Sequence, residues 1–389
     1  MAVDRLFERL GQLYRIGGGR GANRPAYTGA EDEAHRLVAG WMGEAGLEVE
    51  CDPAGNLYGR LRGAQPGLAE VWTGSHLDSV PEGGRFDGPL GVLAGLEAVE
   101  RIGRQERTLT VVAFRDEEGW RFGRGCFGSR ALCGQLEAGE LETRDADGVP
   151  LAEAVGRELP AAGWLERPPA AYVELHVEQG PVLAGLDAPL GVVGAIVGLA
   201  RLGIVFSGAA GHAGTTPMAG RDDALCKAAA FVLRVRDLAA ALPDAVATVG
   251  RFTVEPGAAN VIPSRVSLVV DARAADDEAL AALLEGIEAA AAAAAIERLR
   301  RTSPVPMAES VRTALRSGLG AAGLPAPELH SGAGHDAGVL GAAGVPAGML
   351  FVRSLAGGVS HSPEEESSRE DVALAVDVLA ATLERLAQG

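Results

Sequence analysis

Residues 73–90 read TGSHLDSVPEGGRFDGPL, and the rest of the chain is best understood as a scaffold around this stretch. His76 and Asp78 follow an apolar run, and Asp87 lies in a loop rich in glycine. One imidazole and two carboxylates close together in the sequence suit a divalent metal. A loop with a helix-capping aspartate is the structural alternative. Candidate ligands elsewhere in the chain favour the metal site.

Composition narrows the class of protein. The chain has 389 residues, of which 47% are hydrophobic and 22% charged, so it can bury a substantial core and its length predicts two domains. The net charge of -17 would repel phosphate backbones and anionic membrane surfaces, so we expect neither nucleic acid nor membrane as a partner. The four cysteines have neither zinc-finger spacing nor the density of a disulfide framework. With no apolar stretch of signal-peptide or membrane-span length, the sequence predicts a soluble cytoplasmic protein.

The order of predicted elements is typical of an α/β protein. Short strands alternate with amphipathic helices, and candidate functional side chains follow the strands. Helices are predicted at 6–16, 31–45, 90–102 and 371–386, and strands at 47–51, 57–61, 71–74, 109–114, 171–177 and 347–352; an apolar segment at 191–198 leads out of this part of the chain. Alternation of this kind places ligands at the carboxyl ends of the strands.

A segment with a different order of predicted strands and helices interrupts this alternation. Its predicted order is β-α-β-β-α-β, which describes an α+β (ferredoxin-like) domain. Strands are predicted at 202–207, 245–253 and 266–271, and helices at 222–241 and 278–293. The alanine run 289–295 is predicted as packed helix, because alanine is the best helix former. We therefore predict a discontinuous catalytic domain, residues 1–198 and 309–389, with residues 199–308 inserted as a second domain.

Five imidazole or carboxylate side chains stand at or just beyond predicted strand ends: His76, Asp87, Glu118, His176 and His361. Zinc, manganese, cobalt and nickel all accept this mixture of nitrogen and oxygen ligands. Five ligands are one too many for a closed tetrahedral site. They suit two metals that share one carboxylate, an arrangement that hydrolases use. The sequence therefore predicts two divalent metal ions as cofactors.

Two further carboxylates have predicted roles beside these ligands. Asp78 lies two residues after His76 and is predicted to hold that imidazole in its metal-binding tautomer. Glu117 is predicted to be the general base, because a free carboxylate beside the bound Glu118 can carry protons while its neighbour coordinates metal. Consecutive glutamates are common on solvated helices, but these two follow an apolar strand and precede Gly119.

Eight motifs together point to a known family. They are, in order, GSHLDSVPEGGRFDGPLG (74–91), DEEGWRF (116–122), ELHVEQGP (174–181), GHAGTTPM (211–218), NVIP (260–263), DAR (271–273), SGAGHDA (331–337) and GVSHSPEE (358–365). This ordered set resembles the amidase branch of the M20 metallopeptidase family, and the resemblance covers nearly the whole chain. The branch contains N-carbamoyl-L-amino-acid amidohydrolases, β-ureidopropionases and allantoate amidohydrolases.

The resemblance implies an architecture and a division of the site residues. The architecture is a di-metal, aminopeptidase-like catalytic domain with a smaller dimerisation domain, working as a homodimer. The family's metal ligands fall on the five residues named above, with Asp87 as the bridge, and its base falls on Glu117. Substrate contacts are implied at Gln179, His212, Asn260 and Arg273.

The implied substrate contacts have distinct chemistry. His212 and Asn260 would reach the active site of the partner subunit, where His212 would stabilise a developing oxyanion. Arg273 offers a planar fork for a substrate carboxylate. A strand-end salt bridge with Asp271 is the alternative role for Arg273.

Two positions depart from the family pattern. Trp120 stands where a small residue is more common, so it either narrows the pocket or packs behind Glu118. Arg353 stands where many members have proline, so it either adds a second anion contact to the substrate site or faces solvent.

The predicted reaction is hydrolysis of the ureido group of an N-carbamoyl-L-amino acid, with the amino acid, carbon dioxide and ammonia as products. Allantoate amidohydrolase and β-ureidopropionase are alternatives with the same machinery and equally small ureido substrates. A peptidase or aminoacylase of the broader family is disfavoured by the EQGP and GHAGTTPM motifs. A catalytically silent binding protein is disfavoured because every predicted ligand and the base are present.

Overall fold

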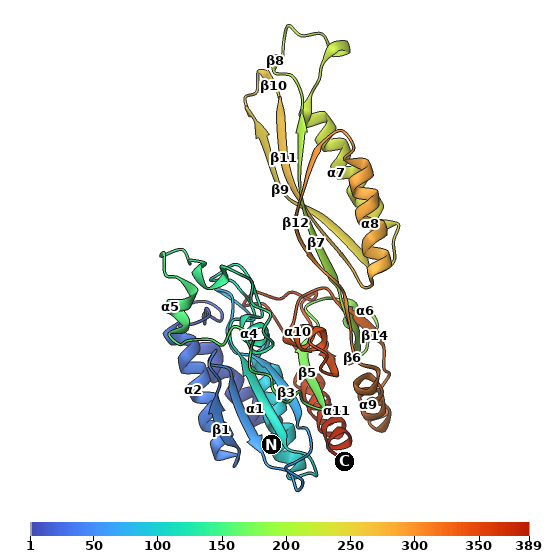
Figure 1. Cartoon of the computed structure of the whole chain (residues 1–389). Coiled ribbons are helices and arrows are strands. Elements are labelled where there is room, and N and C mark those ends of the chain that lie inside the picture. The colour runs from blue at the N-terminus through green and yellow to red at the C-terminus, as the bar shows by residue number, and fades with distance from the viewer. Residues whose placement is uncertain (1, 389) are drawn as a thin grey trace. The chain divides into compact units, whose positions relative to one another are not determined.

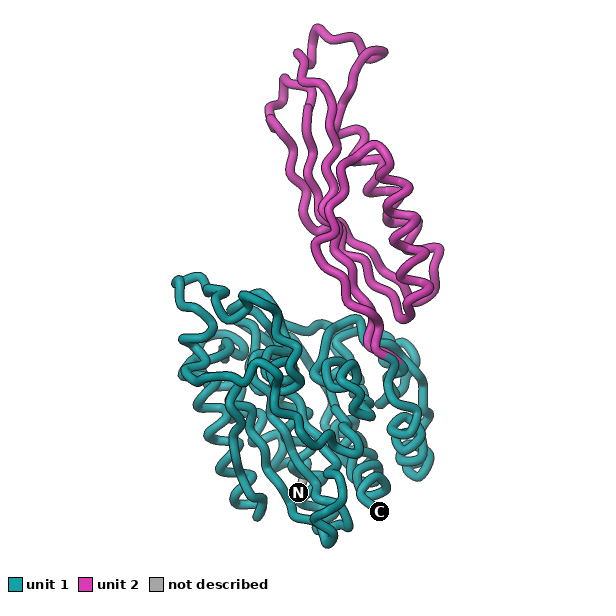
Figure 2. The backbone as a smooth tube through the Cα atoms, in the orientation of Figure 1, with its two compact units in different colours: residues 1–194, 306–389 teal, residues 195–305 magenta. Residues whose placement is uncertain are grey.

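The computed structural model describes residues 2–388, which form two compact units. The first unit combines both ends of the chain, up to residue 194 and from residue 306 (Figure 2). The second unit is the intervening segment, residues 195–305. Within the described residues, no helix is long and apolar enough to cross a membrane.

A nine-stranded mixed sheet forms the centre of the first unit (Figure 1). Its strands follow the order β1-β2-β4-β3-β5-β15-β6-β13, and β14 pairs with β6. Their bounds are β1 (Glu48–Cys51), β2 (Leu57–Leu61), β3 (Val71–His76), β4 (Leu109–Phe114), β5 (Ala171–Val177), β6 (Leu190–Ile196), β13 (Val305–Pro306), β14 (Glu328–Ser331) and β15 (Ala347–Val352). Strands β4, β3, β5 and β15 run parallel, so their carboxyl ends meet at one edge.

The four parallel strands are buried along their whole length. Continuous apolar runs are typical of strands that are covered on both faces. In β5 the side chains alternate between these faces: Val173 and Leu175 belong to the large hydrophobic core, whereas Glu174 and His176 do not. Polar chemistry is therefore confined to one face of β5.

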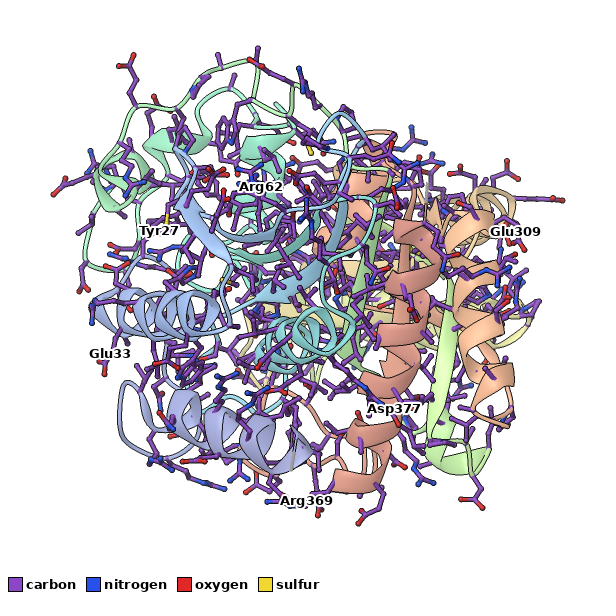
Figure 3. All side chains as sticks on the ribbon, turned by 90° about the horizontal axis from the view of Figure 1, so that it is seen from below. Tyr27, Glu33, Arg62, Glu309, Arg369 and Asp377 are labelled. Carbon is purple, nitrogen blue, oxygen red and sulfur yellow. The ribbon has the colours of Figure 1, made fainter. Side chains whose placement is uncertain are left out.

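Helices cover both faces of this sheet. The core face carries α1 (Ala2–Arg15), α3 (Pro89–Ile102), α9 (Glu309–Ala321) and α11 (Arg369–Ala387), and α2 (Gly29–Glu44) packs on β1 and β2. Figure 3 shows Glu309 on α9 and Arg369 and Asp377 on α11. On the other face α10 (Asp336–Ala342) contacts β5, β15 and α4 (Phe127–Leu132). Three short elements lie in the connections: η1 (Glu140–Glu142), α5 (Leu151–Val155) and α6 (Val182–Gly185).

Local sequence signals explain where several of these helices begin. The hydroxyl of Ser368 accepts a hydrogen bond from the N–H of Asp371 and so caps α11. Pro89 opens α3, at a position where its missing N–H costs nothing. The Asp223 carboxylate accepts from Leu225 and Cys226 at the start of α7 in the second unit.

The second unit runs in the order β-α-β-β-α-β and forms a four-stranded antiparallel sheet, β12-β7-β11-β9. Its elements are β7 (Gly198–Ser207), α7 (Ala224–Ala240), β9 (Ala245–Glu255), β11 (Arg265–Ala274), α8 (Asp277–Ala290) and β12 (Ala295–Thr302). Alternate residues of β7 and β11 are buried with α7 and α8 in a separate core. A small ladder of β8 (Gly211–His212) and β10 (Val261–Ile262), with the turn η2 (Met218–Gly220), completes this unit.

The prediction that the alanine run continues as helix to residue 295 was wrong. Helix α8 ends at Ala290, and Ala295 opens strand β12, where it pairs with Val205 of β7. Alanine prefers helix by only a fraction of a kcal/mol per residue over most other residues. A whole ladder of hydrogen bonds along β7 outweighs that preference.

Candidate metal centre

Two groups of metal-ligating side chains share one carboxylate at the carboxyl edge of the parallel strands. The first consists of His76, Asp87 and His176, and the second of Asp87, Glu118 and His361. Within each group, the ligand atoms all lie within 4.8 Å of one another. Asp87 faces the first group with Oδ1 and the second with Oδ2. The structure therefore brings all five predicted ligands together.

The separations within these groups suit cations. Asp87 Oδ1 lies 3.5 Å from Nε2 of His76 and 3.2 Å from Nε2 of His176. Nε2 of His361 lies 3.4 Å from Asp87 Oδ2 and 3.2 Å from Glu118 Oε2. Two ligands at about 2.0–2.1 Å from a tetrahedral ion are about 3.4 Å apart. The donor atoms are thus spaced as ligands of a shared ion would be.

The burial of the donor atoms provides a second test of whether these residues suit a metal ion. Among the described residues, Nε2 of His76 and Nε2 of His176 are buried and have no hydrogen-bond partner. Buried polar atoms without a partner cost free energy. A divalent cation would supply the missing interaction, so the residues present fit a metal.

Each ligand owes its place to an element of the first unit. His76 is the last residue of β3, His176 lies near the end of β5, and Glu118 follows β4. Asp87 lies in the loop before α3, where Gly88 has a φ of +80° and a side chain would overlap the His76 ring. His361 comes from the loop after β15 and itself has a φ of +54°.

Hydrogen bonds fix the two imidazoles of the first group. Nδ1 of His176 lies 2.9 Å from the carbonyl oxygen of Val177. A carbonyl oxygen only accepts, so Nδ1 carries the proton and Nε2 is left for a cation. Nδ1 of His76 lies 3.3 Å from both the carbonyl oxygen and Oδ1 of Asp78.

The buried carboxylate of Asp78 also holds the segment after β4. Its Oδ1 accepts the N–H of Glu117 and its Oδ2 accepts the N–H of Glu118, each at 3.1 Å. One side chain thereby fixes His76 and the main chain of both glutamates. Asp78 belongs to neither donor group.

Glu117 lies beside the donor groups without belonging to them. Its Oε2 is 3.8 Å from Nε2 of His76, and its Oε1 is 3.9 Å from Nδ1 of His335. Burial raises the pKa of Glu117 well above its usual range, although the neighbouring His76 opposes this shift. The arrangement leaves Glu117 able to accept a proton next to the ligands.

His335 is a site residue for which no role was predicted. It is buried, its ring centroid lies 4.6 Å from that of His176, and its Nε2 is 2.8 Å from the hydroxyl of Ser331. Burial lowers the pKa of His335 well below its usual value, so the ring is neutral. The available signal was its position in the glycine-bearing SGAGHDA motif.

Gln179 contacts the shared carboxylate directly. Its Nε2 lies 2.9 Å from Asp87 Oδ2 and 3.4 Å from the hydroxyl of Ser360. The backbone of Gln179 is in the left-handed region, with a φ of +57°. Within the described part of the chain, Gln179 Oε1 is buried without a hydrogen-bond partner. The amide therefore offers a free acceptor next to the donor groups.

Of the three predicted substrate contacts of the second unit, two lie at the β8–β10 ladder and one on the four-stranded sheet. His212 is exposed on β8 opposite Val261, and the carbonyl of the neighbouring Asn260 accepts from Ala213. Arg273 lies near the end of β11, where its Nε is 2.8 Å from Asp271 Oδ1. The salt bridge predicted as the alternative role of Arg273 is thus present. The Arg273 side chain is half-buried.

The substrate role predicted for Arg353 does not agree with its surroundings. Its guanidinium forms two hydrogen bonds with Asp371, at 2.8 and 3.1 Å, and a third with Asp187 at 3.1 Å. Paired carboxylates already satisfy its charge, so Arg353 serves as a structural ion pair between a loop and the start of α11. The side chain of Trp120 is 56% exposed, which excludes the interpretation that it packs behind Glu118.

Known proteins resemble this chain over most of its length. A model of the peptidase family M20/M25/M40 matches residues 72–385. An N-carbamoyl-L-amino acid amidohydrolase of Geobacillus stearothermophilus is 43% identical, and the match covers 99% of this chain and 99% of the relative. An allantoate amidohydrolase of Bacillus subtilis (strain 168) is 37% identical over 94% of this chain and 93% of the relative. A solved amidase of the hydantoinase/carbamoylase family from Burkholderia multivorans has a TM-score of 0.91 and 35% identity, covering 100% of this chain and 98% of that one.

Proposed function

The chain belongs to peptidase family M20/M25/M40, and from this premise we propose that it cleaves the ureido group of an N-carbamoyl-L-amino acid. One water is consumed, and the amino acid, carbon dioxide and ammonia are released. The family membership confirms the resemblance carried by the sequence motifs, and the similar amidohydrolases support a hydrolase of C–N bonds. The observation that carries the proposal is the pair of donor groups that share Asp87, with Glu117 free beside them.

Two divalent cations, chosen from zinc, manganese, cobalt and nickel, are the proposed cofactors. In this assignment His76 and His176 would hold one cation, Glu118 and His361 would hold the other, and Asp87, which belongs to both groups, would contribute to each. When bound, the pair would polarise the ureido carbonyl and lower the pKa of an attacking water. A ureido carbon is a poor electrophile, so both effects are needed.

The proposed general base is Glu117. Its carboxylate lies within 4 Å of His76 and of His335, outside the donor groups. It would take a proton from the attacking water and return it to the leaving nitrogen. Asp78 would support this transfer by holding the main chain of Glu117 and the ring of His76.

Gln179 is the proposed source of ureido selectivity. Its buried Oε1 can accept a hydrogen bond from an N–H of the substrate. A substrate without that N–H would leave the acceptor unpaired, and unpaired buried polar groups discriminate strongly between related substrates. This favours a carbamoyl group over an acyl group or a peptide.

The second unit would provide the remaining substrate contacts in a homodimer. Arg273 would bind the substrate carboxylate through its planar guanidinium group. His212 and Asn260 would enter the active site of the partner subunit, with His212 next to the developing oxyanion. The open edges of β9 and β12, which are exposed along much of their length, leave strands free for a second copy.

A substrate and metal panel tests the proposal. Metal-free protein is loaded with zinc, manganese, cobalt or nickel, and ammonia is measured with N-carbamoyl-L-amino acids, N-carbamoyl-β-alanine, allantoate and dipeptides. We expect ammonia from N-carbamoyl-L-amino acids with at least one metal and none from metal-free protein. Allantoate is the second candidate, because relatives with that activity are also similar to this chain. Amine release from dipeptides without ammonia from any ureido compound would reject both candidates.

A further inference from the structure

We propose that Glu365 is a positioning residue that holds Asp87 in place between the two donor groups. Its side chain binds the main chain of the Asp87 loop and, through Ser360, approaches the Asp87 side chain. The inference rests on the proposed function, because the orientation of Asp87 is critical only when both groups hold cations. Glu365 follows the ligand His361 by four residues in the GVSHSPEE motif.

The carboxylate of Glu365 is held by hydrogen bonds alone. Its Oε1 accepts the N–H of Phe86 at 2.7 Å and the N–H of Asp87 at 3.1 Å. The hydroxyl of Ser360 lies 2.7 Å from Oε2. The residue is 6% exposed, and no arginine or lysine of the described chain forms an ion pair with it. Burying a carboxylate without a cation costs free energy, so stability alone does not account for its place.

Ser360 connects Glu365 to the side chain of Asp87. Its hydroxyl lies 2.7 Å from Glu365 Oε2 and 3.0 Å from Asp87 Oδ2. A hydroxyl has one hydrogen, so Ser360 donates to one of these carboxylates at a time. Glu365 therefore holds Asp87 directly, by accepting the main-chain N–H of Asp87, and lies one hydroxyl group away from Asp87 Oδ2.

The Asp87 loop leaves room for this carboxylate at Gly84. A methyl group added to Gly84 would overlap the carboxyl group of Glu365. The backbone of the loop thus closes around the Glu365 side chain. Substitution of Gly84 by alanine offers a way to displace Glu365 without changing it.

Because both donor groups include Asp87, the orientation of its carboxyl group affects both of them. Oδ1 faces His76 and His176, and Oδ2 faces His361. A rotation of the Asp87 carboxyl group would move both oxygens and so weaken both donor groups. Groups that orient a ligand in this way change metal affinity by about 10–100-fold when they are removed.

The test measures cation affinity in four variants of the whole chain. Metal-free Glu365→Ala, Glu365→Gln, Gly84→Ala and Glu364→Ala are titrated with Zn²⁺, Mn²⁺, Co²⁺ and Ni²⁺ against a chromogenic chelator. Glutamine can accept both main-chain N–H groups with its oxygen and donate to Ser360 with its nitrogen, so it keeps the geometry and removes the charge. Glu364 is the matched control, because it is exposed and pairs with Arg20 and Ser362 instead.

We expect Glu365→Ala to lose about 10–100-fold in affinity for at least one cation, and Glu365→Gln and Glu364→Ala to stay near the wild type. Gly84→Ala should reproduce the loss, which keeps the test decisive if Glu365→Ala does not fold. Circular dichroism and thermal unfolding of each metal-free variant establish that it is folded.

Two results would overturn the role of Glu365 and leave the proposed function intact. Equal losses in Glu365→Ala and Glu365→Gln would indicate that the charge acts rather than the position. Unchanged affinity in folded Glu365→Ala and Gly84→Ala would remove the role of Glu365 altogether. Wild-type protein that bound none of the four cations would overturn the proposed function together with this inference.

Discussion

Glu117 and Glu118 are adjacent in the sequence but contact different groups. Glu118 Oε2 lies 3.2 Å from Nε2 of His361, inside the second donor group. Glu117 lies outside both groups and approaches His335. Their main-chain N–H groups bind the two oxygens of one carboxylate, that of Asp78. One short segment after β4 can thus present a metal ligand and a proton acceptor side by side.

Replacing Glu117 by glutamine should separate metal binding from proton transfer. We expect Glu117→Gln to bind the same number of cations as the wild type, because Glu117 belongs to neither donor group. Its turnover number should fall by about 100- to 10,000-fold, the usual contribution of a general base. Metal content by atomic emission and steady-state kinetics of ammonia release check the two expectations. Wild-type turnover in the fully loaded variant would remove Glu117 as the base.

Arg24 stabilises the segment that carries His76 and Asp78 by binding the main chain of Leu77. It is fully buried, and its guanidinium donates to the carbonyl oxygens of Leu77 at 2.8 Å and Leu13 at 2.9 Å. Burial lowers the pKa of Arg24 to about 10, so the group is still charged at neutral pH. Leu77 lies between His76 and Asp78, which links this cation to the placement of both.

Arg24→Met should therefore destabilise the protein markedly. The substitution leaves the buried Leu77 carbonyl oxygen without a donor, which costs about 1–3 kcal/mol. The Leu13 carbonyl oxygen loses one hydrogen bond but still accepts from the N–H of Ile16. We expect the free energy of unfolding, measured by urea denaturation of the metal-free protein, to fall by about 2–4 kcal/mol. Arg20→Met is the control, because Arg20 forms an exposed pair with Glu364. Equal stability of Arg24→Met and the control would contradict the role of the buried hydrogen bonds.

For single residues, the sequence predicted which side chains meet at the edge of the sheet better than it predicted ion pairs. The five ligand candidates could be identified because histidine and acidic residues follow buried strands, and parallel strand ends meet at one edge. Arg353 could not, because its partners Asp187 and Asp371 are far away in the sequence and become neighbours only in the folded chain. The contact of His335 with His176 also depends on tertiary packing that no local pattern encodes.

Among the elements, strands in the interior of the large sheet were the most predictable. The predicted strands at 57–61, 109–114, 171–177 and 347–352 coincide with β2, β4, β5 and β15. Each lies in the interior of a sheet, where burial and propensity favour the same structure. Strand β12 is the contrast, since its residues are exposed and its first alanine favours helix. Only pairing with β7 makes it a strand.

Helix α2 contains a buried histidine that makes stability depend on pH. His35 is buried, and in the described chain neither ring nitrogen has a hydrogen-bond partner. Burial, with a further contribution from Arg115, lowers the pKa of His35 well below its usual value of 6.5. The folded protein therefore keeps the ring neutral at a pH where the unfolded chain protonates it. The stability that this ring contributes is complete above pH 6.5 and is lost as the pH falls below it.

His35→Phe should remove this part of the acid sensitivity. Below about pH 6.5 the free energy of unfolding of the wild type should fall faster than that of the variant, by up to about 1.4 kcal/mol per pH unit. Urea denaturation between pH 7.5 and pH 5 checks the difference, and comparing two proteins isolates the ring from other titrating groups such as Glu31. His330→Phe is the control, because His330 is exposed on β14. Parallel stability curves for wild type and His35→Phe would exclude a buried neutral ring.

For the whole molecule, the sheet of the second unit sets a constraint on the active site. Along β11, Arg265 opposes Ser207 and Arg273 opposes Leu199, so these arginines are eight residues apart, or about 27 Å. His212 lies beyond the Ser207 end of β7, whereas Arg273 lies at the other end. A small ureido acid cannot span that length. If both residues contact one substrate, they must come from two copies of the chain.

Complementation between two inactive variants tests this arrangement. Glu117→Gln lacks the base, and His212→Ala lacks the proposed oxyanion contact. In a mixed dimer, the active site that keeps Glu117 belongs to the His212→Ala chain and receives His212 from the other chain, so one complete site is restored. Random assembly makes half of the dimers mixed, and we expect recovery to about a quarter of wild-type activity. Differently tagged, co-expressed chains purified through both tags allow ammonia release to be measured on the mixed dimer alone, where recovery should reach about half. If His212 instead served the active site of its own chain, every site in the mixed dimer would still lack one residue, and activity would not exceed that of the two variants measured separately.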